Sequence, residues 1–263
     1  MRSEANAISN TSWPAELRAA LTIFIHVDAP DLEHPIDPQP VGLDYTATGL
    51  RRLIALLADL DVSATTAWTA RALASFPQLA RSARDQGHEL ALSKVTPGSG
   101  VCDVKLLTHI SDVAPSGSME SLPMQGISPK SSIDATGSLE EPLAWTVTGV
   151  SGDVPISTMY RGQPGPAIIP VSPYWIDTTW LLPDRPLPPS SMLEAWSLSL
   201  NEVRAEGSLM TIVLHPHVSG RPGFAGLVQH FLDEAIDSGV VWIANAAQVA
   251  EWWHRLEQEA PRT

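Results

Sequence analysis

The segment MTIVLHPHVSGRP, residues 210–222, constrains the fold more than any other part of the chain. Its first five residues are apolar or β-branched and turn formers follow them, which is typical of a strand buried on both faces of a parallel sheet. In α/β proteins, polar side chains at the carboxyl end of such a strand are where active sites collect. His215, His217 and Arg221 are therefore candidate site residues. The alternative is that His215 only caps the strand end through a backbone hydrogen bond.

Strands and helices alternate along the chain after a polar arm at residues 1–16. Strands are predicted at residues 21–27, 61–68, 88–92, 144–150, 167–171, 210–214 and 240–243. Helices are predicted at residues 50–60, at 70–84 with an interruption near Pro77, at 193–207, at 224–235, and after a capping box of Asn245 and Gln248. Residues 103–110 fit a helix or a strand, and residues 183–191 are predicted to be a loop. The alternation indicates one α/β domain with a parallel sheet or barrel.

The composition narrows the classes of partner. Hydrophobic residues make up 44% of the chain and charged residues 17%, which is typical of a globular protein. The formal charge of -13 argues against nucleic acid or an anionic membrane surface as a partner, because both reward basic patches. The nine tryptophans favour an aromatic interface in a homo-oligomer, or in a hetero-oligomer with a homologue.

Neither a disulfide nor membrane insertion is expected. Cys102 is the single cysteine, which excludes an internal disulfide and a cysteine-based zinc cage. The first residues lack the continuous apolar core of a signal peptide, and no apolar run approaches the roughly 20 residues that span a bilayer. A cytoplasmic protein is therefore expected.

A second strand end adds polar groups to the predicted site. The strand at residues 21–27 closes on His26 and Asp28. Because the carboxyl ends of parallel strands meet at one edge of a sheet, His26, Asp28 and His215 are expected to lie close together. The proline-rich loop at residues 29–42 carries His34, which we interpret as a solvated loop residue rather than a pocket residue.

The order of these motifs resembles the polysaccharide deacetylase (NodB-homology) family, in particular its allantoinase-like and cyclic-imide-hydrolysing branch. The resemblance rests on His26-Val27-Asp28, on LRRLIALLADLDVSATTAW leading to GHELA at residues 87–91, on PVSPYWIDT at 170–178, and on LHPHVSGRP followed by VVWIANAAQVAEWW. It implies an irregular (β/α) barrel that forms a single domain over residues 1–263. It also implies a site at the carboxyl ends of the strands.

The resemblance further implies a mechanism whose parts can be checked residue by residue. Active members use one Asp as general base, while a second Asp and two histidines hold a divalent metal that polarises an amide carbonyl and activates water. Asp28 matches the metal-binding carboxylate, and His26 stands where the base would be. His215 matches the histidine that serves as general acid.

The remaining metal ligands of that pattern are missing here. Counted from His88, the two metal-histidine positions fall on Ser93 and Pro97, and neither supplies an imidazole. The family's arginine strand has its nearest counterpart at residues 126–129, which contain no arginine. A metal held by His26, Asp28 and His88 is a weaker alternative, because the GHE histidine of the family is usually structural. No metal cofactor is therefore expected.

Two hypotheses of function follow. The first is a metal-independent hydrolase that acts on a C–N bond of a small non-peptide amide, imide or ureide. His215 and His26 would transfer protons and Asp28 would orient or stabilise an imidazolium. The second is a catalytically inactive family member that serves as a partner or regulatory subunit of an active homologue.

Five further residues are expected to bind the substrate of the hydrolase. They follow the predicted strands at the same edge, where aromatic walls and a few polar groups suit a small ligand. These residues are Tyr174, Trp175, Asp177, His217 and Arg221. A place in the core is the alternative for Trp175.

Overall fold

The computed structural model describes residues 13–30, 43–93, 100–119, 143–148, 152–160, 162–181 and 187–259. Several expectations fall outside these residues. They concern most of the polar arm, His34 with most of its loop, Pro97, and the segment 126–129.

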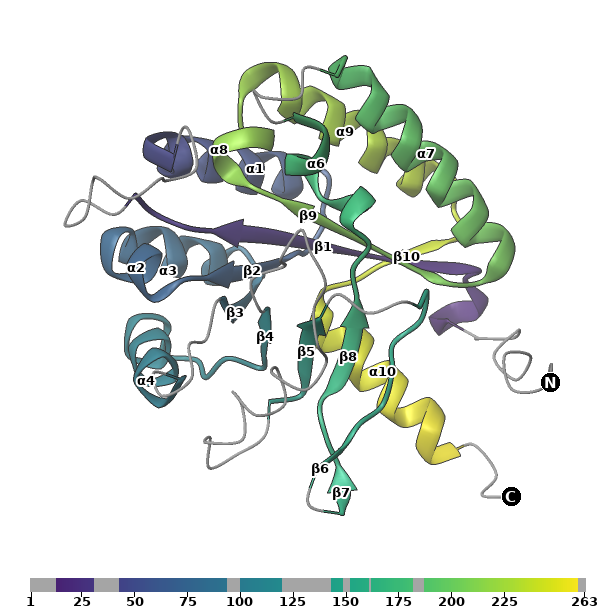
Figure 1. Ribbon diagram of the computed structural model, residues 1–263, viewed down its shortest axis with the longest axis horizontal. Coiled ribbons are helices and arrows are strands. Elements are labelled where there is room, and N and C mark those ends of the chain that lie inside the picture. Colours follow the sequence, from purple (N-terminus) through teal and green to yellow (C-terminus); the bar gives the residue numbers. More distant parts are fainter. Residues whose placement is uncertain are drawn as a thin grey trace.

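The core of the fold is one parallel sheet built around its first strand (Figure 1). The strands are β1 (Ala19–Val27), β2 (Thr65–Trp68), β3 (Glu89–Ser93), β4 (Gly117–Met119), β5 (Trp145–Thr148), β8 (Ala167–Pro170), β9 (Leu209–Leu214) and β10 (Val241–Ile243). Strand β1 pairs with β9 on one side and with β10 and then β2 on the other, and β3, β4, β5 and β8 follow β2. A parallel bridge between Ile176 and Val213 joins the segment after β8 back to β9. The sheet therefore curls into the irregular barrel that the sequence predicts.

Helices pack around this barrel. They are α1 (Thr46–Asp59), α2 (Ala70–Ser75), α3 (Pro77–Asp85), α4 (Gly100–Ser111), α6 (Asp177–Leu181), α7 (Pro189–Glu206), α8 (Pro216–Ser219), α9 (Pro222–Asp237) and α10 (Ala246–Glu259). In Figure 1, α1, α7, α8 and α9 lie on one side of β1 and β9, while α10 lies on the opposite side near β8. A small antiparallel hairpin, β6 (Met159–Tyr160) and β7 (Gln163–Pro164), extends away from the barrel (Figure 1).

Most predicted elements are present, with local corrections. The capping box is confirmed, because the Asn245 and Gln248 side chains each accept the other's backbone N–H at 3.0 Å. The ambiguous residues 103–110 lie in helix α4. The predicted loop at 183–191 is wrong at its end, since α7 already begins at Pro189, and proline is well tolerated in the first turn of a helix. Strand β4 has only three residues, too few for a periodic pattern.

Alternation along β1 and β9 separates an outer core from an inner one. Leu21, Ile23 and Ile25 pack outward under the helices, whereas Ala20 and Phe24 pack inside the barrel. Successive side chains on a strand point to opposite faces, so His26 shares the inner face with Phe24. The same rule places Val213, and after it His215, on the inner face of β9.

A partly buried carboxylate lies at the amino end of the barrel. Glu89, the first residue of β3, accepts hydrogen bonds from the Ser116 hydroxyl and the Trp145 indole through Oε1. Its Oε2 accepts from the Thr65 hydroxyl at 2.7 Å and from the Ala247 N–H at 3.0 Å. A carboxylate near the first turn of α10 is also favoured by the helix dipole.

His88 belongs to this amino end as well. The residue precedes β3 and is buried, and its Nδ1 accepts the Ala64 N–H at 3.2 Å. His26 and Asp28 lie at the opposite end of the sheet, at the end of β1. The fold therefore does not bring His88 together with His26 and Asp28.

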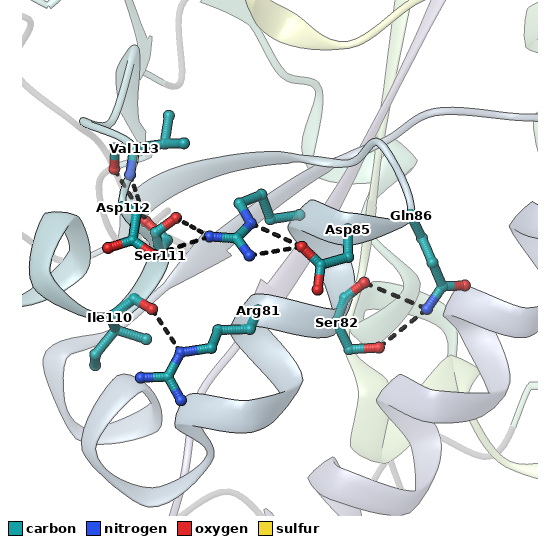
Figure 2. Close-up of polar contacts among 9 residues, drawn as sticks. Arg81, Ser82, Asp85, Gln86, Ile110, Ser111, Asp112 and Val113 are labelled. Carbon is teal, nitrogen blue, oxygen red and sulfur yellow. Dashed lines mark hydrogen bonds and ion pairs between the residues drawn. The ribbon is translucent and has the colours of Figure 1, made fainter.

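Helices α3 and α4 are joined through arginine side chains. Arg81 Nε donates to the Ile110 carbonyl at 2.8 Å. Figure 2 shows this bond next to the polar contacts of Asp85, Ser111 and Asp112. Arg84 donates to the Ser111 carbonyl and forms an ion pair with Asp85 at 2.6 Å. Cationic groups at the last carbonyls of α4 satisfy acceptors that the helix leaves open.

Helix α8, which follows His215, is in backbone contact with α1. A Cβ added to Gly49 would lie 1.9 Å from the Pro216 carbonyl oxygen, and one added to Gly220 would lie 2.3 Å from the Gly49 Cα. Such distances leave no room for a side chain on either glycine. The two glycines thus set how closely the segment after β9 approaches α1.

Gly49→Ala is expected to destabilise the protein by about 2 kcal/mol or more, because backbone must move to admit the methyl group. The measurement is the free energy of unfolding in urea. Gly226→Ala is the matched control, since a Cβ there meets nothing within 4 Å on helix α9. The free energy of unfolding of this control should stay the same or rise by up to about 1 kcal/mol, because alanine has a higher helix propensity than glycine. Equal stability of the two variants would contradict the close contact.

Candidate active site

His215 is held by a fully buried carboxylate. Asp177 Oδ1 lies 2.6 Å from His215 Nδ1, and Asp177 Oδ2 accepts the His215 backbone N–H at 2.7 Å. The Ser219 hydroxyl donates to the same Oδ2 at 2.6 Å. An ionised carboxylate only accepts hydrogen bonds, so Nδ1 of His215 carries a proton and Nε2 is left for proton exchange.

The bridge that closes the barrel places this carboxylate. Ile176 pairs in parallel with Val213, so Asp177 follows directly beside the end of β9. Asp177 is also the first residue of α6, and His215 follows the last residue of β9. Two segments far apart in sequence therefore meet at this bridge and at the contact between Asp177 and His215.

His26 reaches across the neighbouring strand to Ser93. Its Nε2 lies 2.7 Å from Ser93 Oγ, and both residues are buried. Ala67 stands beside His26 on β2 and is in register with Ala91 on β3. Because both alanines face the barrel interior with small side chains, the imidazole can extend over them toward the end of β3.

The two histidine rings lie together. The centroids of His26 and His215 are 5.0 Å apart with an interplanar angle of 74°. Each ring extends the inner face of its own strand, β1 or β9, and these strands pair directly. The sequence-based expectation that they share one edge of the sheet agrees with this arrangement.

Asp28 is fixed at the same edge by the start of α2. Its Oδ1 accepts hydrogen bonds from the Ala29 N–H at 2.9 Å and from the Thr69 hydroxyl at 3.0 Å. Thr69 Oγ1 in turn accepts the Ala72 N–H and so caps α2. One threonine therefore links the carboxylate after β1 to the strand end of β2.

His217, the second residue of α8, adds a third imidazole. It is buried, and its ring centroid lies 5.7 Å from that of His215. The pKa of His217 is lowered to about 4, mainly by burial and next by the neighbouring His215 and Arg221, while Asp177 and Asp28 act in the opposite direction. His217 is therefore neutral at pH 7.

The other residues expected to bind substrate have different surroundings. Tyr174 is 67% exposed, and its carbonyl accepts the indole N–H groups of Trp180 and Trp196. Trp175 is buried in the outer core. Arg221 is exposed, and its guanidinium lies 4.6 Å from the centre of the Tyr45 ring.

Sequence reasoning placed Asp177 among the substrate-binding residues and did not assign Ser93, Thr69 or Ser219 a partner. The contacts of Asp177 instead run to His215 and Ser219 behind the imidazole. The alternation of β3 was the available signal for Ser93, because it shares a face with Ala91. Asp177 carried no comparable signal, since its contact depends on the barrel closing.

The donor set does not fit the metal that the family resemblance implies. Ser93 occupies one metal-histidine position and is hydrogen-bonded to His26, and Pro97 at the other has no side-chain donor. Over the ranges that the structure describes, no group of three or more His, Cys, Asp or Glu residues is arranged to hold a metal ion. We therefore derive no chemical step through a metal.

Neither a family model nor a curated protein matches the chain. Among solved structures, a putative polysaccharide deacetylase from Mycobacterium smegmatis is 24% identical with a TM-score of 0.81, over 97% of this chain and 96% of its own. The Puue allantoinase is 18% identical with a TM-score of 0.81, over 100% of this chain and 99% of its own. The chain has the polysaccharide deacetylase fold. The predicted NodB-type barrel is thus confirmed.

The same fold extends to a protein without activity. The Bacillus anthracis protein BA3943, described as a CE4 family pseudoenzyme, is 11% identical with a TM-score of 0.54, over 88% of this chain and 65% of its own. The polysaccharide deacetylase fold alone therefore does not decide between catalysis and its loss.

Within the described residues, no helix has the length and apolarity needed to cross a membrane.

The buried neutral His217 predicts a particular pH dependence of stability. Its pKa in the folded protein, about 4, lies below the usual 6.5, so the unfolded chain takes up a proton first as the pH falls. The stability that this residue contributes above pH 6.5 is lost between pH 6.5 and 4. Its size is about 3 kcal/mol at most.

His217→Gln should therefore make the fall in unfolding free energy from pH 7 to pH 4 shallower by up to that amount. Urea unfolding at several pH values measures this slope. His230→Gln, which removes an exposed histidine on α9, should keep the slope of the parent protein. A slope in His217→Gln equal to that of His230→Gln would show that His217 is not buried in neutral form.

Proposed function

We propose that the protein is a hydrolase that cleaves a C–N bond in a small non-peptide amide, imide or ureide without a metal. The proposal rests on two contacts of His215. Its Nδ1 contacts the buried carboxylate of Asp177, and its ring centroid lies 5.0 Å from that of His26. Deacetylation and allantoin hydrolysis both break a C–N bond, so the named fold neighbours support this class of reaction.

The two histidines are suited to opposite proton transfers. Asp177 accepts a hydrogen bond from Nδ1 of His215, which leaves Nε2 to give a proton to the leaving nitrogen. His26 Nε2 lies 2.7 Å from the Ser93 hydroxyl and is placed to accept a proton. We therefore assign His215 as general acid and His26 as general base.

The carboxylate and the substrate contacts complete the proposal. Asp28 carries negative charge at the edge where the histidines meet, and we assign it to stabilising positive charge during the reaction. Neutral His217 offers a donor and an acceptor for an amide-like group. Tyr174 and Arg221 are exposed, so they are proposed only for the rim of the site.

An inactive protein is the second candidate, favoured by the altered metal-ligand positions and by the similarity to a pseudoenzyme. Such a chain would act as a partner or regulatory subunit of an active homologue. Against it stands the convergence of His215 and His26 at one edge of the sheet, with Asp28 at the same edge, which an inactive site does not require. Assembly into oligomers and a cytoplasmic location stay predictions.

His215→Gln is expected to lower kcat by about 1,000-fold or more, because the leaving nitrogen loses its proton donor. Turnover is measured on a panel of cyclic imides, hydantoins, allantoin and simple N-acetyl amides. His230→Gln is the control and should retain the parent rate. Undiminished turnover by His215→Gln would end the acid assignment. No turnover by the parent protein, together with stable binding to a homologue bearing the complete metal site, would favour the inactive candidate.

Removal of metal is expected to leave turnover within about twofold of its starting value, because the proposed proton transfers use only side chains. The protein is dialysed against a strong chelator, its metal content is measured by mass spectrometry, and the rate is compared with that of protein to which Zn²⁺ or Co²⁺ is returned. A stoichiometric metal whose loss abolishes turnover and whose return restores it would contradict the metal-independent route.

A further inference from the structure

We propose that Ser93 is the nucleophile of this hydrolase and forms an acyl-enzyme, with His26 as the base that activates it. The inference rests on the proposed function and adds the identity of the attacking atom. It turns on the 2.7 Å contact between Ser93 Oγ and His26 Nε2. That distance lies within the range of activated nucleophile and base pairs.

The position of the pair separates it from an ordinary buried hydrogen bond. Ser93 is the last residue of β3, on the inner face and at the carboxyl edge of the barrel. Ser118 provides a comparison on the next strand, since it is also buried and, among the described residues, its hydroxyl contacts Thr146 Oγ1 at 3.5 Å rather than an imidazole. The hydroxyl at the site edge is the one that has an imidazole base beside it.

The loss of a metal ligand at position 93 is a reason to expect a different nucleophile in this site. In the family pattern, the position of Ser93 carries a metal histidine, and the metal activates water. With serine there, an amide carbonyl needs another strong nucleophile held in place. A hydroxyl fixed beside its base meets that need, because attack becomes intramolecular within the complex.

Acylation balances with the groups present. Ser93 Oγ attacks the carbonyl carbon while its proton passes to His26 Nε2. The tetrahedral intermediate then collapses, the C–N bond breaks, and the nitrogen takes the Nε2 proton of His215. The products are an ester on Ser93, a protonated His26 and a neutral His215.

Deacylation returns each group to its first state. A water molecule attacks the ester and gives a proton to His215. The C–O bond to Ser93 breaks, and the serine oxygen takes back the proton from His26. The two histidines, with ring centroids 5.0 Å apart, can serve both steps at one carbonyl group.

The test uses p-nitrophenyl acetate, an activated ester that reveals a serine nucleophile without knowledge of the natural substrate. The parent protein should release a burst of about one p-nitrophenolate per chain, and acid quenching should trap one acetyl group on the peptide that contains Ser93. Ser93→Ala should lose the burst and the adduct. Ser118→Ala, the matched buried serine, should keep both.

Two further variants exclude loss of folding as the cause. His26→Gln should slow the burst by about 100-fold or more while Ser93 remains in place. Ser93→Cys should restore acetylation at the same position through its thiol. Circular dichroism and urea midpoints of all variants establish that they are folded.

The outcomes separate this inference from the proposed function. Turnover of the imide and amide panel without a burst, or with Ser93→Ala as active as the parent, would overturn the nucleophile and leave the hydrolase intact. An adduct on any other residue would also overturn it. A burst with the acetyl group on Ser93 but no turnover of the panel would support the nucleophile and reject the proposed C–N substrate class.

Discussion

The contact between Asp177 and His215 holds the carboxyl edge of the barrel together. A carboxylate without solvent exposure is costly unless hydrogen bonds replace the lost water, and here the donors come from the His215 backbone, its ring and Ser219. The contact joins the segment after β8 to the end of β9, next to the bridge that closes the sheet. Closure of the barrel and the orientation of the proposed acid therefore depend on the same few atoms.

Two strands of the site were predictable because their signal is local. The apolar runs ending at His26 and at His215 identify buried parallel strands, and a parallel sheet brings their carboxyl ends to one edge. The partners of these histidines were not predictable in the same way. Asp177 follows Ile176 after a short 3-10 turn, Pro173–Trp175, and only the barrel closure brings it beside β9.

Ser93 shows a different limit of sequence reasoning. By the family pattern, the position of Ser93 is a lost metal ligand. That interpretation explains why serine does not bind the metal, but it does not suggest that serine could be a nucleophile. Alternation along β3 already places it on the inner face, but the reach of the His26 ring across Ala67 and Ala91 depends on the register of three strands. Ala67 and Ala91 indicate a contact between His26 and Ser93 only once the register of these strands is known.

The three imidazoles of the site have different surroundings and are proposed to have different roles. Asp177 contacts one side of the His215 ring, while burial first and His215 second lower the pKa of His217 and keep it neutral. His26 also lies beside His215, and like charges at such distances disfavour each other. The proposed reaction uses His215 as the acid and the adjacent His26 as the base. Asp177 holds the proposed acid in place and Ser93 lies beside the proposed base, so two adjacent histidines have the separate roles that hydrolysis needs.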